Sequence, residues 1–169
     1  MKKRCAFCDK DAKISGEHIW SEWMRELFPA KRFLFTQRNE KGEIVSVWNP
    51  PDIDLTANVV CKPCNEGWMS NLESRHAKPS MRDLILGDKG ITVSESRARS
   101  MAIFAFKTAV VVDHMYRRPL PFFSRSIRYR FAKSLTIPEN VMMWFAGFLN
   151  FGGGLVESFY PEGCIEPQT

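Results

Sequence analysis

Two pairs of cysteines have the spacing of metal ligands. Cys5 and Cys8 are separated by two residues, and so are Cys61 and Cys64. A CxxC segment is a short chelating loop whose sulfurs both reach one zinc ion at about 2.3 Å, so each pair supplies half of a tetrahedral site. The sequence therefore predicts one structural zinc, with protein sulfur in all four positions. A redox pair or an iron–sulfur cluster is the alternative for the same cysteines.

An acidic residue and a histidine stand side by side between the two pairs, at Glu17 and His18. Hydrolysis of a phosphodiester at neutral pH needs a base for the attacking water and a cation that neutralises the charge developing on the phosphate. His18 could take the proton while Glu17 and a second carboxylate, Glu73, hold a hard cation such as Mg²⁺ or Mn²⁺. A zinc ion that joins the cysteine pairs would bring these side chains near Asn65.

This combination resembles the HNH, or His-Me finger, endonucleases, in the branch with two CxxC pairs around the nuclease hairpin. The resemblance is carried by the first cysteine pair, by Gly16-Glu17-His18-Ile19-Trp20 and by the segment from Val60 to Glu73, which together span less than half of the chain. It implies a DNA endonuclease with a treble-clef-like, zinc-stabilised ββα-metal core. It also implies phosphodiester cleavage that leaves a 5′-phosphate.

The same resemblance implies a role for each residue. His18 takes the place of the general base, and Glu17 stands where the family more often has an aspartate as metal ligand. Asn65 matches the middle asparagine, which orients the base. Glu73 falls where the family has its final histidine or asparagine, so the chain departs from the HNH letters there. His76, about one helical turn further along, is the rival of Glu73 as second ligand.

Each of these residues also has a purely structural interpretation. His18 taken alone could be a structural histidine, and Asn65 could cap the helix that follows the second cysteine pair. Glu73 and His76 could lie on a solvated helix face. The occurrence of all these residues in the expected order favours the nuclease interpretation.

The pattern of apolar residues predicts the elements that position the site. We expect a short strand at 10–14 that Gly16 interrupts and a helix over 20–28 with Ser21 as N-cap. A β-hairpin over 33–48, inserted in the core, and a strand over 55–60 follow. We then expect a helix from Cys64 or Asn65 to about His76, which ends before Pro79.

The second part of the chain is expected to be helical and basic. Residues 87–90, Gly-Asp-Lys-Gly, predict a boundary between a zinc-stapled nuclease domain at 1–87 and a region at 91–169. This region should hold a buried helix over 96–117, a helix over 123–135 and a C-terminal β-hairpin over 141–160. The apolar run of the first helix is interrupted by Lys107. The fold class is therefore α+β.

The positive charge is concentrated in this second region. The chain has a formal net charge of +5, and residues 97–133 contain nine lysines and arginines but one acid, Asp113. Such a segmental bias is typical of nucleic-acid binding, although an ordinary solvated helix surface is the alternative. We expect the DNA backbone to be held by a set of basic residues, Arg97, Arg99, Arg125, Arg128, Arg130 and Lys133.

Composition limits the class of protein. With 169 residues and 44% hydrophobic content the chain can bury one good core. The start of the sequence lacks the pattern of a signal peptide, and the longest apolar run is too short to span a bilayer. Free thiols that can take metal suit a reducing compartment, so we expect a cytoplasmic protein without membrane association.

Three functions remain open at this point. The first is a metal-dependent DNA endonuclease, which would need a dimer or two events to cut both strands because one active site cuts one strand. The second is a non-catalytic, zinc-dependent nucleic-acid-binding module. The third is an interaction protein whose helix over 96–117 packs against a partner.

Overall fold

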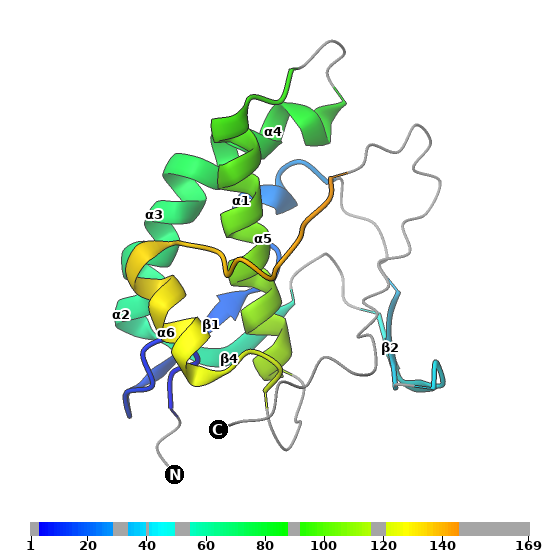
Figure 1. Ribbon diagram of the computed structural model, residues 1–169. Helices are drawn as coiled ribbons and strands as arrows, with labels where there is room; N and C mark the ends of the chain where they lie inside the picture. The colour runs from blue at the N-terminus through cyan, green and yellow to red at the C-terminus, as the bar shows by residue number, and fades with distance from the viewer. Residues whose placement is uncertain are drawn as a thin grey trace.

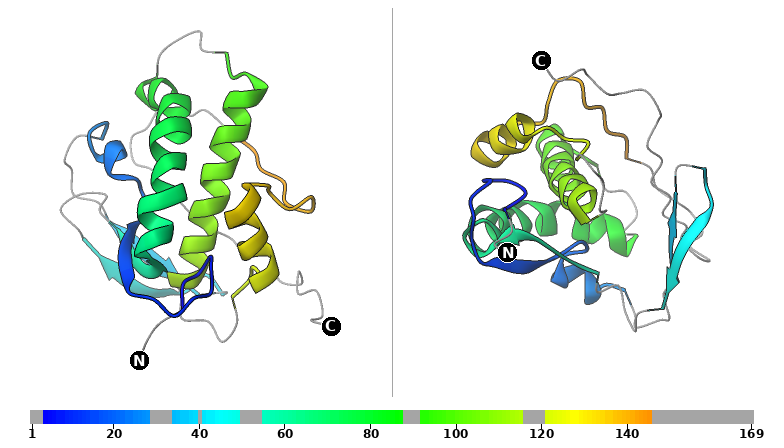
Figure 2. Two further views of the ribbon diagram at one scale, coloured as in Figure 1. Left: turned by 90° about the vertical axis from the view of Figure 1, so that its left-hand side faces the viewer. Right: turned by 90° about the horizontal axis from the view of Figure 1, so that it is seen from below.

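The structure is a computed structural model that describes residues 4–28, 34–39, 41–49, 55–87, 92–115 and 121–145. The fold is α+β, as predicted, with two small antiparallel sheets and several helices. The helices α5 (Glu95–Met115) and α6 (Arg125–Ser134) confirm the two helices expected in the second region. Figure 2 shows α5 lying between α6 and the helical run that follows the second cysteine pair.

The first sheet carries the residues of the predicted site. Strand β1 (Ile14–His18) pairs antiparallel with β4 (Thr56–Cys61), and the register is irregular on either side of Gly16. The expected strand at 10–14 is therefore wrong in position, because pairing starts at Ile14 and continues through the glycine. A β-bulge absorbs the mismatch at this point and bends the strand. Strand β4 confirms the strand expected over 55–60.

The second sheet is the predicted hairpin, formed by β2 (Phe35–Arg38) and β3 (Ile44–Trp48). Its turn is held by Asn39, whose side-chain oxygen accepts from the backbone N–H groups of Lys41 and Glu43 at 3.0 and 2.9 Å. Figure 1 shows this hairpin standing away from the helices. The hairpin is an insertion between the two strands of the first sheet.

The helical run after the second cysteine pair is longer than predicted. Its segments follow one another without a break: α2 (Lys62–Cys64), η1 (Asn65–Met69), α3 (Ser70–Leu72), η2 (Glu73–Ala77) and α4 (Lys78–Leu86). The expected end before Pro79 is wrong. A proline lacks the N–H that an α-helix interior requires, but here it follows a widened π-type turn in which the N–H of Lys78 reaches back to the carbonyl of Glu73. The run ends at Gly87, whose φ of 75° is favourable for glycine.

The main core contains residues from both sides of the predicted boundary. Phe7 and Val60 from the first region are buried with Phe106, Val110 and Phe131 from the second. The ring centroids of Phe106 and Phe131 lie 4.7 Å apart in a T-shaped contact. Helix α5 thus packs into the same core as the cysteine-bearing segments.

Two other predicted elements differ in extent or location. Helix α1 (Glu22–Arg25) is shorter than the expected helix over 20–28, and it buries Trp23 and Met24 in a second cluster with Phe104 of α5. Ser21 is its N-cap position, but its side chain makes no capping bond. The C-terminal hairpin expected over 141–160 lies outside the described residues, except for Val141–Phe145, which form no strand.

Candidate functional site

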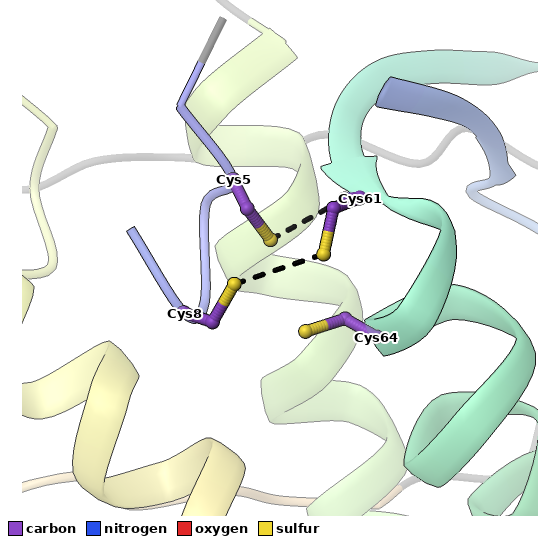
Figure 3. A group of neighbouring side chains, drawn as sticks. All are labelled: Cys5, Cys8, Cys61 and Cys64. Carbon is purple, nitrogen blue, oxygen red and sulfur yellow. Dashed lines mark hydrogen bonds between the residues drawn. The ribbon is translucent and has the colours of Figure 1, made fainter. Parts of the chain in front are cut away.

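The four cysteines of the two CxxC pairs come together as predicted. Their sulfur atoms all lie within 4.8 Å of one another (Figure 3). A tetrahedron with zinc–sulfur bonds of about 2.3 Å has sulfur–sulfur edges of about 3.8 Å, and the Sγ atoms of Cys8 and Cys61 are 3.7 Å apart. The cluster is positioned to bind one metal ion, and four sulfur ligands with this spacing suit zinc.

The second cysteine pair is positioned by the junction of a strand and a helix. Cys61 is the last residue of β4, and Cys64 is the last residue of α2, one turn further along (Figure 3). Its partner pair lies in a tight turn, in which the N–H of Asp9 bonds to the carbonyl of Cys5 at 3.0 Å. The backbone N–H of Cys61 also points at the sulfur of Cys5, 3.3 Å away. The two segments are therefore docked around the sulfur atoms.

Helix α6 clamps the first cysteine turn from outside. Arg128 is buried, and its guanidinium donates to the carbonyl oxygens of Ala6 and Phe123. Arg125 forms an ion pair at 2.8 Å with Asp9, the residue directly after the turn. Asp9 has a left-handed backbone with a φ of 56°, a conformation that aspartate tolerates better than most residues. The position of the first cysteine pair thus depends on residues of α6, which are distant in the sequence.

Because the thiols lie close together, their pKa values differ from one another. A hydrogen bond from the Cys64 thiol lowers the pKa of Cys5 to about 4 and, for the same reason, raises the pKa of Cys64. Burial raises the pKa of Cys61. The cluster therefore favours a thiolate that accepts a hydrogen bond from a neighbouring S–H group. A metal ion that binds all four sulfurs has to displace the remaining thiol protons.

Asn65 links the start of the helical run to β1. Its Nδ2 donates to the carbonyl oxygen of Gly16 at 2.9 Å and lies 3.1 Å from the hydroxyl oxygen of Ser15. Its backbone is helical and it lies inside the helical run, whose N-cap position is Cys61. The capping interpretation of Asn65 is therefore wrong, and the amide instead braces the bulge that precedes Glu17 and His18.

Glu17 and Glu73, the two predicted metal ligands, converge on one atom. The Nζ of Lys107 lies 2.7 Å from Oε1 of Glu17 and 2.8 Å from Oε1 of Glu73. The lysine and Glu17 are almost completely buried, whereas the side chain of Glu73 is 22% exposed. Burial raises the pKa of Glu17, and the charge of Lys107 opposes that shift. The two carboxylates thus flank a site for a cation, and the ammonium group of Lys107 occupies it.

The two histidines of the motif lie in different surroundings. His18 is the last residue of β1, pairs with Thr56 of β4 and is half-buried. His76 is exposed, whereas Glu73, on the same helical run, reaches the lysine that Glu17 also contacts. The geometry therefore favours Glu73 over His76 as the partner of Glu17.

Lys107 is the member of this site that sequence reasoning missed. It comes from α5, ninety residues after Glu17. The available signal was a lysine inside an apolar helix, because a charged side chain in such a position is rarely buried unless it is paired. The sequence does not contain the identity of its partners, since that depends on how α5 packs against β1 and η2.

The six basic residues predicted to bind DNA have different environments. Arg128 is buried and engaged with backbone carbonyls, as described above. Arg97 is half-buried, with its Nε donating to the carbonyl of Ser80 at 2.8 Å. Arg125 pairs with Asp9 but keeps 71% of its side chain exposed. The remaining members of the set are exposed: Arg99, Arg130 and Lys133.

An open cleft borders the acidic pair on the side of Glu73. It has a volume of about 640 Å³ and runs between α1 and the helical run. Ser70, Glu73, Ser74 and Lys78 form one wall, and Trp23 lies on the other. Glu73 is therefore the member of the acidic pair that a ligand in this cleft would meet.

No protein-family model, curated protein or solved structure matches the chain significantly. Within the described ranges, none of the helices combines the length and the apolar character needed to cross a membrane. The functional interpretation therefore rests on the arrangement of the residues themselves.

Proposed function

We propose that the protein is a metal-dependent DNA endonuclease of the HNH type, stabilised by zinc at the four cysteines. The observation that supports this most strongly is the meeting of Glu17 and Glu73 at one cationic atom, 2.7 and 2.8 Å from their Oε1 atoms. The two carboxylates come from a strand and from a helix, and His18 directly follows one of them. This convergence of two carboxylates beside a histidine supports the proposal.

In the proposed reaction His18 is the general base. It accepts a proton from water while the water oxygen bonds to phosphorus and the bond from phosphorus to the 3′ oxygen breaks. The 3′ oxygen takes a proton from solvent, and the products are a 5′-phosphate and a 3′-hydroxyl. Glu17 and Glu73 would hold the Mg²⁺ or Mn²⁺ ion, which would supply positive charge for the phosphate.

Asn65 acts in this mechanism as a positioning residue. Its amide holds the carbonyl of Gly16, two residues before His18, so it restrains the strand from which the base projects. Among the exposed basic side chains, Arg99, Arg130 and Lys133 would contact DNA phosphates without reading its sequence. Affinity for DNA should therefore fall steeply with salt.

A plasmid-nicking assay tests the proposal. The zinc-loaded protein is incubated with supercoiled plasmid in Mg²⁺, in Mn²⁺ and in EDTA, and zinc is measured before and after. We expect nicking with a divalent ion and at least a hundredfold slower nicking by His18→Ala, a loss of the size expected for a general base. The exposed His76→Ala is the matched control and should retain activity. Equal nicking by the wild-type protein and His18→Ala would remove His18 from the mechanism.

A second candidate function is favoured by one specific observation. The ammonium group of Lys107 is already bound to both carboxylates, so the two acids can act as a structural ion pair in a non-catalytic, zinc-dependent nucleic-acid-binding module. Such a module would bind DNA with a steep salt dependence and would not cleave it with any divalent ion. The nicking assay combined with a gel shift separates the two functions.

A further inference from the structure

The acidic pair contains its own cation. Lys107 is 1% exposed, and its Nζ lies between Oε1 of Glu17 and Oε1 of Glu73. A buried lysine that points at two carboxylates is a second feature of this site, independent of the acidic residues themselves. The position of Lys107 demonstrates that the site between the two carboxylates accepts a positively charged group.

A divalent ion and this ammonium group are incompatible at short range. Mg²⁺ and Mn²⁺ bind carboxylate oxygens at about 2.0–2.2 Å, and a lysine ammonium has no lone pair with which to act as a ligand. Nζ is 2.7 and 2.8 Å from one oxygen of each carboxylate. An ion on the same carboxylates is therefore repelled strongly by Nζ, because little solvent separates the two charges.

The charge of the site leads to the same conclusion. With both carboxylates and the lysine ionised the three side chains carry a net charge of −1, and the neighbouring His18 adds none when it is neutral. A divalent ion would change that to +1 in a buried position, which is unfavourable. Without the ammonium charge, the side chains would carry a net charge of −2 and would attract the ion more strongly. The ring of Phe104, with its centroid 4.9 Å from Nζ, already contacts the ammonium group where it stands between the carboxylates.

We infer that Lys107 and a divalent ion compete for Glu17 and Glu73, so that the ion enters the site only by displacing the lysine. The inference rests on the proposed function, since it concerns the same carboxylates. In the metal-free protein the lysine keeps the two acids together. Metal affinity is correspondingly weak, and the negative charge of a substrate phosphate helps the ion to replace the lysine.

Direct measurement of Mn²⁺ binding tests the inference. Free Mn²⁺ is quantified by electron paramagnetic resonance during titration of the zinc-loaded protein and of Lys107→Met, which keeps the length of the side chain and removes its charge. We expect Lys107→Met to bind Mn²⁺ at least about tenfold more tightly, because a unit charge within a few ångströms has been removed. Lys62→Met is the control, since Lys62 is exposed and pairs with Glu66 at 3.4 Å, and its affinity should equal that of the wild type.

Equal or weaker Mn²⁺ binding by Lys107→Met overturns the inference and assigns Lys107 a positioning role. Absence of Mn²⁺ binding by both proteins overturns it as well. If Lys107→Met does not fold, the comparison is made in the background of Glu17→Gln, which retains one carboxylate. There Lys107→Met combined with Glu17→Gln should bind Mn²⁺ more tightly than Glu17→Gln alone, and equal affinities reject the competition.

The outcome can be separated from that of the proposed function. Tighter Mn²⁺ binding by Lys107→Met, together with an absence of nicking by every protein, supports the competition and rejects the nuclease. Nicking by the wild type, together with equal Mn²⁺ affinities, supports the nuclease and rejects the competition. Zinc content is measured in each sample so that Mn²⁺ at the cysteines is not counted.

Discussion

The Nδ2 of Asn65 lies 2.9 Å from the carbonyl oxygen of Gly16. This hydrogen bond joins the first residue after the second cysteine pair to the irregular point of β1. The amide thus donates a hydrogen bond to the strand at the point where its register shifts. The conformation of the chain at Glu17 and His18 therefore depends on a side chain that is held next to the four-cysteine cluster.

Replacement of Asn65 tests this dependence. Asn65→Ala removes the donor to Gly16, and we expect it to lower the free energy of unfolding by about 0.5–1.5 kcal/mol, the usual net contribution of a hydrogen bond. If the protein is a nuclease, nicking should fall by a larger factor than this loss of stability explains. Urea unfolding and the nicking assay measure the two effects.

Asn65→Asp is the matched comparison, because it keeps the shape and replaces the donor with an acceptor. It should be at least as damaging as Asn65→Ala, since the carboxylate would face the carbonyl oxygen of Gly16. If either variant has the same stability and the same nicking rate as the wild type, the role given to the Asn65 amide is contradicted.

Removal of the metal should unfold the region around the four cysteines. Cys61→Ser replaces a sulfur that lies in the buried cluster, so we expect the protein to lose most of its bound zinc and several kcal/mol of stability. Elemental analysis and circular dichroism with and without EDTA provide the measurement. Cys164→Ser, at a cysteine outside both pairs, is the control and should leave the zinc content at one ion per chain. Retention of that ion by Cys61→Ser would exclude the four-sulfur site.

The stability of the fold should depend on pH through His114. Burial lowers the pKa of this histidine, whose Nδ1 lies 3.0 Å from the carbonyl oxygen of Val110. The unfolded chain therefore takes up a proton near its ordinary value of about 6.5 before the folded protein does. Stability is fully present above that value and falls as the pH drops through the lower pKa of the folded state, by at most about 1.4 kcal/mol per pH unit.

Thermal or urea unfolding between pH 5 and pH 8 measures this effect. His114 is also affected electrostatically by the buried Arg128 and Asp113 and by the sulfur of Cys5. The comparison is therefore made with His114→Gln, in which these other groups remain. The variant should have a flatter dependence on pH. The exposed His76→Gln should follow the wild type, and a wild-type slope in His114→Gln would refute the assignment.

Arg128 and Arg130 should separate stability from DNA binding. Arg128→Met leaves the carbonyl oxygens of Ala6 and Phe123 without their donor, so we expect a loss of about 1–3 kcal/mol in unfolding free energy. Arg130→Met, at an exposed position of the same helix, should leave stability unchanged. If α6 contacts DNA, Arg130→Met should weaken binding and reduce its salt dependence. The opposite pattern would place the DNA contact at the buried arginine.

Local chemistry made much of this site predictable. The CxxC spacing predicted a common metal site because each short loop can supply two of the four ligands of one ion. The four sulfur atoms do lie close together. A shared zinc at the cysteines, together with the resemblance to the HNH family, predicted that Glu17 and Glu73 lie near each other, and both contact Lys107. The hairpin and the helices α5 and α6 followed from clear apolar patterns and turn residues.

The features that were missed depend on contacts distant in sequence or on unusual backbone. The helical run passes Pro79 because π-type turns rearrange its hydrogen bonds, and no simple periodicity reports such turns. Strand β1 continues through Gly16 because β4 and Asn65 supply its partners. The partners of Lys107 became known only from the packing of α5.

The origin of Lys107 in α5 limits how far the protein can be shortened. A fragment that stopped at Gly87 would retain every residue of the HNH-like motif, but it would leave Glu17 and Glu73 facing each other without a counterion. It would also uncover the apolar surface that Phe106 and Val110 now occupy. A minimal version of this scaffold therefore has to include α5, or carry a neutral residue in place of one of the two acids.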